Sequence, residues 1–165
     1  MSSESPLNTF NWISWSKNLG LFLILNFGAL AIGALLQGEG PSSMWYSNLD
    51  RAPWTPPGWV FGAAWFSIML CFAIYLANLS QKISLAVFLP LYAIHWIFNV
   101  SWNPLFFNWH LIGVALIVLL ALTIVVGLLL YRFRKFSGNS SWLIAPYLIW
   151  LCIALSLNVY VLINN

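Results

Sequence analysis

The chain has 165 residues, of which 62% are hydrophobic and only 5% are charged, and its formal net charge is +3. Soluble globular domains carry about 25% charged residues, so this composition excludes a water-soluble fold and indicates a polytopic membrane protein. The charged residues all lie outside the apolar runs, so the basic balance is a signal of membrane orientation and predicts no nucleic-acid partner.

Five apolar segments are each long enough to cross a bilayer, which takes about 20 apolar residues in a helix. We expect one domain, residues 1–165, with spans at 18–37, 57–79, 83–102, 109–131 and 141–163. No segment alternates apolar and polar residues as a strand of a membrane β-barrel would. The predicted fold class is therefore an all-α membrane protein, a bundle of five transmembrane helices with a long loop between helices 1 and 2.

The ends and connections of these segments predict an orientation. The polar N-terminus carries Glu4 before any apolar run, so we expect no cleavable signal peptide. Five of the 6 basic residues fall on one side of this topology and only Arg51 falls on the other, which places the N-terminus inside. Pro90 lies within the third segment and predicts a kink or a local break in that helix.

Polar residues within the segments predict faces that point into the bundle. His95, Asn99 and Asn103 recur every fourth residue, so they stack on one helix face, and Tyr147 and Asn158 share a similar face in the last segment. Such faces either form hydrogen bonds between helices or line a ligand cavity. His95 is also a candidate haem ligand, but no second axial residue stands out, and we expect no metal site.

Small residues and tryptophans carry further signals. Ala29 and Gly33 form a small-residue pair that predicts close helix packing, either within one bundle or across a homodimer. Trp65 and Trp150 lie too deep within their segments for the headgroup level, so each either packs in the core or stacks on a flat ligand. Other tryptophans lie near segment boundaries, where an aromatic belt meets the lipid interface: Trp12, Trp15, Trp109 and Trp142.

Three motifs resemble one known family. The first connection, WYSNLDRAPWTPPGWVFGAAW (residues 45–65), resembles the signature loop of the translocator protein family, also called TspO, tryptophan-rich sensory protein or peripheral-type benzodiazepine receptor. FNVSWNPLFF (98–107) and APYLIWLCIALSLN (145–158) resemble the end of its third helix and its fifth helix. The tyrosine and arginine of the animal sterol motif are replaced by Val159 and Ile163, which argues against sterol recognition there and favours a bacterial member.

The resemblance implies five transmembrane helices, often paired as a homodimer, around a cavity that the first loop covers as a lid. It implies a flat, apolar ligand, such as a porphyrin, haem, sterol or synthetic drug. It also implies a protein in contact with membrane lipid that requires no cofactor. The candidate ligand-binding residues, carried over by matched position, are Trp45, Tyr46, Trp54, Trp65, Asn99, Trp102, Tyr147 and Trp150.

Three functions remain open at this point. A binding protein that senses, regulates or transports tetrapyrroles accounts for the tryptophan-rich loop and for the deep Trp65 and Trp150. An enzyme that degrades protoporphyrin in light would use Trp65 and Trp150 as catalytic residues, and no membrane carboxylate, Ser-His-Asp set or Cys-His set supports other chemistry. A scaffold would use its tryptophans only as anchors in the bilayer.

Overall fold

The computed structural model describes residues 10–165, and over this range the chain is helical, with no β-strand. Glu4, on which the prediction about a signal peptide depends, lies outside the described residues. Short helical turns join the longer helices: η1 (Gly40–Ser42), η2 (Pro104–Asn108) and η3 (Gly138–Ile144). The α-helices are α1 (Trp12–Leu36), α2 (Met44–Asn48), α3 (Gly58–Ser80), α4 (Leu85–Asn103), α5 (Ile112–Ser137) and α6 (Ala145–Asn164).

Four continuous helical segments in the described range are long and apolar enough to cross a membrane. The first three contain α1, α3 and α4, and the fourth joins α5 to α6 through η3, from Ile112 to Asn164. Large apolar side chains such as Ile24, Leu35 and Ile117 are exposed on the outside of the bundle, where lipid would cover them. The chain is therefore an integral, multi-pass membrane protein.

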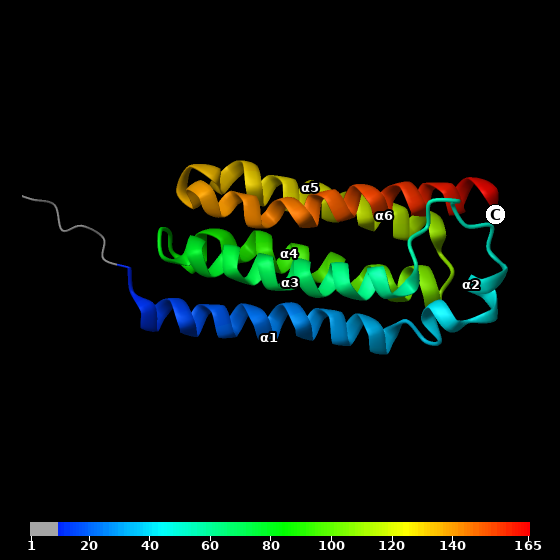
Figure 1. Ribbon diagram of the computed structural model, residues 1–165, viewed down its shortest axis with the longest axis horizontal. Coiled ribbons are helices and arrows are strands. Elements are labelled where there is room, and N and C mark those ends of the chain that lie inside the picture. Colours follow the sequence, from blue (N-terminus) through cyan, green and yellow to red (C-terminus); the bar gives the residue numbers. More distant parts are fainter. Residues whose placement is uncertain (1–9) are drawn as a thin grey trace, which may run out of the picture.

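The long helices lie side by side and alternate in direction along the chain (Figure 1). α1 forms one flank and packs against α3 and α4, while α5 packs against α4 and α6 on the other side (Figure 1). Segment 37–57, which contains η1 and α2, crosses the end of the bundle where the C-terminus lies (Figure 1). This segment is called the 37–57 connection below.

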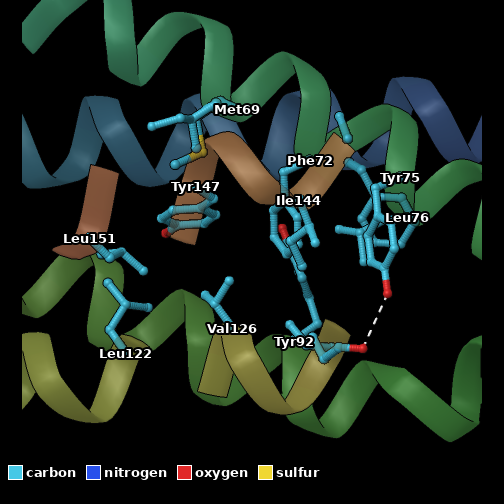
Figure 2. Close-up of a cluster of buried hydrophobic side chains, with 14 of the residues drawn as sticks. Met69, Phe72, Tyr75, Leu76, Tyr92, Leu122, Val126, Ile144, Tyr147 and Leu151 are labelled. Carbon is cyan, nitrogen blue, oxygen red and sulfur yellow. Dashed lines mark hydrogen bonds between the residues drawn. The ribbon is translucent and has the colours of Figure 1, made fainter. Parts of the chain in front are cut away.

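The centre of the bundle is a cluster of buried rings and aliphatic side chains from α3 to α6 (Figure 2). Met69, Phe72 and Leu76 recur at helical spacing along α3 and are completely buried. The Tyr75 hydroxyl donates to the backbone carbonyl of Leu129 on α5 at 3.2 Å. Because lipid tails are as apolar as these side chains, close packing and hydrogen bonds hold the helices together more than the hydrophobic effect does.

Proline and small residues act differently in two of the helices. α4 runs without interruption from Leu85 to Asn103, so Pro90 does not break it. Pro90 has no backbone N–H and removes one helical hydrogen bond, but the helical hydrogen bonds on either side outweigh this loss. Ala29 and Gly33 are buried within the chain, and a Cβ on Gly33 would lie 2.6 Å from Nδ2 of Asn103. This pair therefore packs α1 inside the bundle, and a homodimer, which stays a prediction, would use another surface.

The tryptophans expected in an aromatic belt are mostly exposed at the helix ends. Trp12, Trp109 and Trp142 expose 60% or more of their surface, as an interfacial position requires. Trp15 differs, because it is half-buried and its Nε1 donates to Oδ1 of Asn78 on α3 at 2.7 Å. Trp15 therefore also fastens the start of α1 to the end of α3.

Candidate functional site

Two adjoining cavities lie between the helices. The first, called the α6 cavity, has a volume of about 220 Å³ and is bounded by α3, α4, α5, α6 and the 37–57 connection. The second, called the α1 cavity, has a volume of about 460 Å³ and is bounded by α1, α3, α4 and α5. Pockets for small organic ligands commonly measure about 300–1,000 Å³ and are mostly apolar, so this space suits such a ligand. The two cavities share six lining residues, namely Gln37, Phe61, Trp65, Trp102, Asn103 and Leu119.

Aromatic rings form much of the wall, and each is held by another ring. Trp150 of α6 is 7% exposed and meets Phe61 of α3 edge to face, with ring centroids 5.3 Å apart. Trp102 stacks on Phe106 at 5.2 Å with an interplanar angle of 14°. Trp65 lies edge to face with a neighbouring tyrosine ring at 5.9 Å. Rings fixed in this way give a flat ligand apolar surfaces on several sides.

The tyrosine behind Trp65 is Tyr147, which is completely buried and lines neither cavity. Its hydroxyl accepts a hydrogen bond from Nδ2 of Asn99 at 2.7 Å and lies 2.9 Å from Nε2 of His95. His95 also lies outside both cavities, so it is not placed to ligate a haem held there. Asn99 lines the α1 cavity. Tyr147 thus supports the cavity wall and couples α6 to α4.

The 37–57 connection reaches the α6 cavity through Tyr46. Ser43 caps the start of α2, since its Oγ accepts from the backbone N–H of Tyr46 at 3.1 Å. Trp54 is 55% exposed, and its Nε1 donates to Oγ of Ser156 on α6 at 3.2 Å. This hydrogen bond ties the connection to α6 beside the cavity.

A stacked pair fixes the other side of the same connection. Trp45 of α2 lies over the ring of His110 at 3.9 Å, with an interplanar angle of 18°. His110 follows η2, and its φ of 55° is in the left-handed region, which a residue with a Cβ rarely adopts. Neither ring lines the α6 cavity or the α1 cavity.

The eight predicted site residues therefore fall into three groups. Four line the α6 cavity (Tyr46, Trp65, Trp102 and Trp150), of which Trp65 and Trp102 also line the α1 cavity, and Asn99 lines the α1 cavity alone. The other three line neither: Trp45 stacks on His110, Trp54 binds Ser156, and Tyr147 lies behind the wall.

Arg51 and Asn158 are among the residues that line the α6 cavity but were not predicted as site residues. The sequence pointed to Asn158 as a residue facing into the bundle, because it shares a helix face with Tyr147. It pointed to Arg51 as the lone basic residue on its predicted side of the membrane. Within residues 10–165, no group of three His, Cys, Asp or Glu side chains is arranged to hold a metal ion. The site therefore offers aromatic stacking and hydrogen bonding.

Comparison with known proteins agrees with this architecture. Residues 21–163 match the model of the TspO/MBR family. A tryptophan-rich sensory protein from Cereibacter sphaeroides is 32% identical over 76% of this chain and 77% of its own. Protein CrtK from Rhodobacter capsulatus is 30% identical over 86% of this chain and 90% of its own. The translocator protein of Homo sapiens is 30% identical over 92% of this chain and 91% of its own. The chain belongs to the TspO/MBR family.

Proposed function

We propose that this protein binds a flat, apolar tetrapyrrole of the porphyrin or haem class between its helices, and acts as a tetrapyrrole sensor, regulator or transporter. The observation that carries this proposal is the arrangement of Trp65, Trp102 and Trp150 around one space, with Trp65 and Trp102 lining both cavities. Indole rings stack well on flat, conjugated ligands. The names of two relatives, a sensory protein and a translocator protein, support a role in signalling or transport.

We further infer five membrane crossings. The helical segment from Ile112 to Asn164 has 53 residues. If straight, it would be about 80 Å long at about 1.5 Å per residue, far more than the roughly 30 Å core of a bilayer. α5 and α6 instead lie side by side (Figure 1), so each would cross once, in addition to α1, α3 and α4.

We infer that the 37–57 connection is the lid of this space. Tyr46 and Arg51, which belong to it, line the α6 cavity. Its attachment to α6 consists of the hydrogen bond from Trp54 to Ser156, the contact of the Trp54 and Tyr160 rings at 5.5 Å, and the hydrogen bonds between residue 50 and the side chain of Asn165. For this segment to swing aside and admit a ligand, these contacts and the stack of Trp45 on His110 would have to break.

The first test is a titration of the purified protein with protoporphyrin IX. Trp65→Ala and Trp150→Ala are each expected to weaken binding about tenfold or more, because each removes a ring contact worth about 1.4 kcal/mol or more. Trp59→Ala is the matched control, since Trp59 is also in α3 but is 75% exposed and lines neither cavity. Binding no greater than in protein-free micelles would contradict the proposal.

A light-dependent enzyme that degrades protoporphyrin IX is the second candidate function. Trp65 and Trp150 line the same cavity, and Trp65 lies against Tyr147, whose hydroxyl is 2.9 Å from His95. Oxidisable rings beside the Tyr147–His95 pair could pass an electron to the photoexcited porphyrin, with molecular oxygen as the terminal oxidant. Illuminated wild-type protein should then form a defined product that Trp65→Phe and Trp150→Phe do not form. Equal loss of pigment in all three proteins would indicate simple bleaching of the porphyrin.

A further inference from the structure

Buried polar atoms without partners lie in the wall of the α6 cavity. Asn158 is 2% exposed, and within the described residues neither its Nδ2 nor its Oδ1 has a hydrogen-bond partner. Nε1 of Trp102 is also buried without a partner there. Both residues line the α6 cavity. Since buried polar groups are nearly always hydrogen-bonded, such atoms indicate where polar atoms of a ligand would bind.

Arg51 brings a positive charge to the same cavity. Among the described residues that line it, Arg51 is the only charged one, and the nearby acids Glu39 and Asp50 do not line it. The Arg51 guanidinium carbon lies 5.2 Å from the ring centroid of Tyr46, which also lines the cavity. This cation–π contact holds an exposed arginine beside the opening. The cavity therefore favours an anionic ligand group over a cationic one.

These three side chains lie toward the same end of the bundle. Arg51 belongs to the 37–57 connection, and Trp102 is close to the end of α4. The backbone N–H and carbonyl of Asp50 bind the side chain of Asn165, so the last turns of α6, with Asn158, lie beside the connection. Trp150 lies farther from this end, by about 12 Å along α6 at about 1.5 Å per residue.

We propose that Arg51, Trp102 and Asn158 form a carboxylate subsite at this end of the α6 cavity, so that the cavity selects flat, apolar acids over their esters. The inference rests on the proposed function, because it needs a flat ligand between the indoles. The guanidinium would give charge-assisted hydrogen bonds to the carboxylate. Trp102 Nε1 and Asn158 Nδ2 would add neutral donors, and Asn158 Oδ1 would accept from a second, undissociated carboxyl group.

The proposal is tested with two probes that differ only at the carboxyl groups, protoporphyrin IX and its dimethyl ester. Both are titrated into the full-length protein in lipid nanodiscs, with protein-free nanodiscs as the blank for partition into lipid. The wild-type protein should bind the acid about tenfold or more tightly than the ester, as charge-assisted hydrogen bonds predict. The acid-to-ester ratio of affinities is then compared among variants.

Arg51→Gln and Asn158→Leu should each lower this ratio at least threefold, because each should weaken binding of the acid more than binding of the ester. Arg51 is exposed, so its replacement leaves the core intact and remains informative if Asn158→Leu folds poorly. Trp102→Phe should lower the ratio as well, because it keeps a ring but removes the N–H. Lys82→Gln is the matched control, since it removes one positive charge from an exposed position outside both cavities.

The outcomes separate this inference from the proposed function. Tight binding of both probes with equal affinity would overturn the carboxylate subsite and leave the tetrapyrrole proposal standing. Equal loss of both probes in Arg51→Gln would also overturn the subsite, because Arg51 would then act only on the shape of the lid. Failure of the wild-type protein to bind either probe would contradict the proposed function and the subsite together.

Discussion

Removing the hydroxyl of Tyr147 should destabilise the bundle without changing its shape. Tyr147→Phe deletes one oxygen atom and keeps the ring that packs against Trp65. That oxygen accepts from Asn99 at 2.7 Å and lies 2.9 Å from Nε2 of His95. Tyr147 and His95 are 0% and 1% exposed, so water does not reach the His95 nitrogen that loses its partner, and Asn99 is 5% exposed at the wall of the α1 cavity.

The expected loss follows from these two hydrogen bonds. An interhelical hydrogen bond in a membrane protein contributes about 0.6–2 kcal/mol, and an unpaired buried group costs more than a solvated one. Loss of both bonds should lower the free energy of unfolding by about 1–3 kcal/mol. For a chain of about 150–250 residues, about 1 kcal/mol shifts Tm by about 2–4 °C, so Tm should fall by about 3–10 °C.

Thermal unfolding in detergent, followed by near-ultraviolet circular dichroism, measures this shift. Tyr131→Phe is the control, because Tyr131 is 67% exposed and has no buried role. Asn99→Ala and the double variant complete a double-mutant cycle, in which a coupling energy of about 0.5 kcal/mol or more is expected between contacting residues. A change in Tm below about 1 °C for Tyr147→Phe, or a coupling energy of zero, would refute the reasoning.

Two further predictions concern backbone positions. Gly33→Leu should lower Tm by several degrees, because its Cβ would lie 2.6 Å from Nδ2 of Asn103. Gly28→Leu should not lower Tm, because a Cβ at Gly28 would have nothing within 4 Å. Equal shifts in the two variants would contradict this account of α1 packing. His110→Ala should lower Tm by a few degrees, because it loses the stack on Trp45 and keeps a φ of 55°. His110→Gly should lower Tm less, because glycine adopts this φ freely, and a larger drop for glycine would show that no backbone strain is relieved.

The long helices could be predicted because a bilayer requires long apolar runs, but their ends could not. α1 begins at Trp12, before the predicted span, because Oδ1 of Asn11 accepts from the backbone N–H of Ser14 at 3.0 Å and caps the helix. α5 begins at Ile112, after the π-helical turn η2 and the left-handed His110. Both ends depend on local hydrogen bonds and backbone angles, which average hydropathy does not report.

The cavity wall could be predicted only in part. The depth of Trp65 and Trp150 within apolar runs indicated that both leave the headgroup level, and both line the α6 cavity. Tyr147 sits on a polar helix face, but only the tertiary arrangement of the helices brings its hydroxyl to Asn99 of α4. Asn158 was missed as a site residue because an unpaired amide is a tertiary property: it requires knowing that no neighbour among residues 10–165 reaches it.

The core of the bundle and the walls of the cavities share some of their side chains. Met69, Phe72 and Leu76 lie outside the lining of both cavities, whereas Leu119, Leu122 and Trp150 belong to the same core cluster and also line a cavity. The 37–57 connection, which we propose as the lid, is tied to α6 by few hydrogen bonds, but Trp45 stacks on His110 and Trp54 meets the ring of Tyr160. Opening of the proposed lid would therefore have to break these ring contacts as well as the exposed hydrogen bond from Trp54 to Ser156. If the proposed lid opens in this way, a flat ligand would reach the cavities while Met69, Phe72 and Leu76 stay packed.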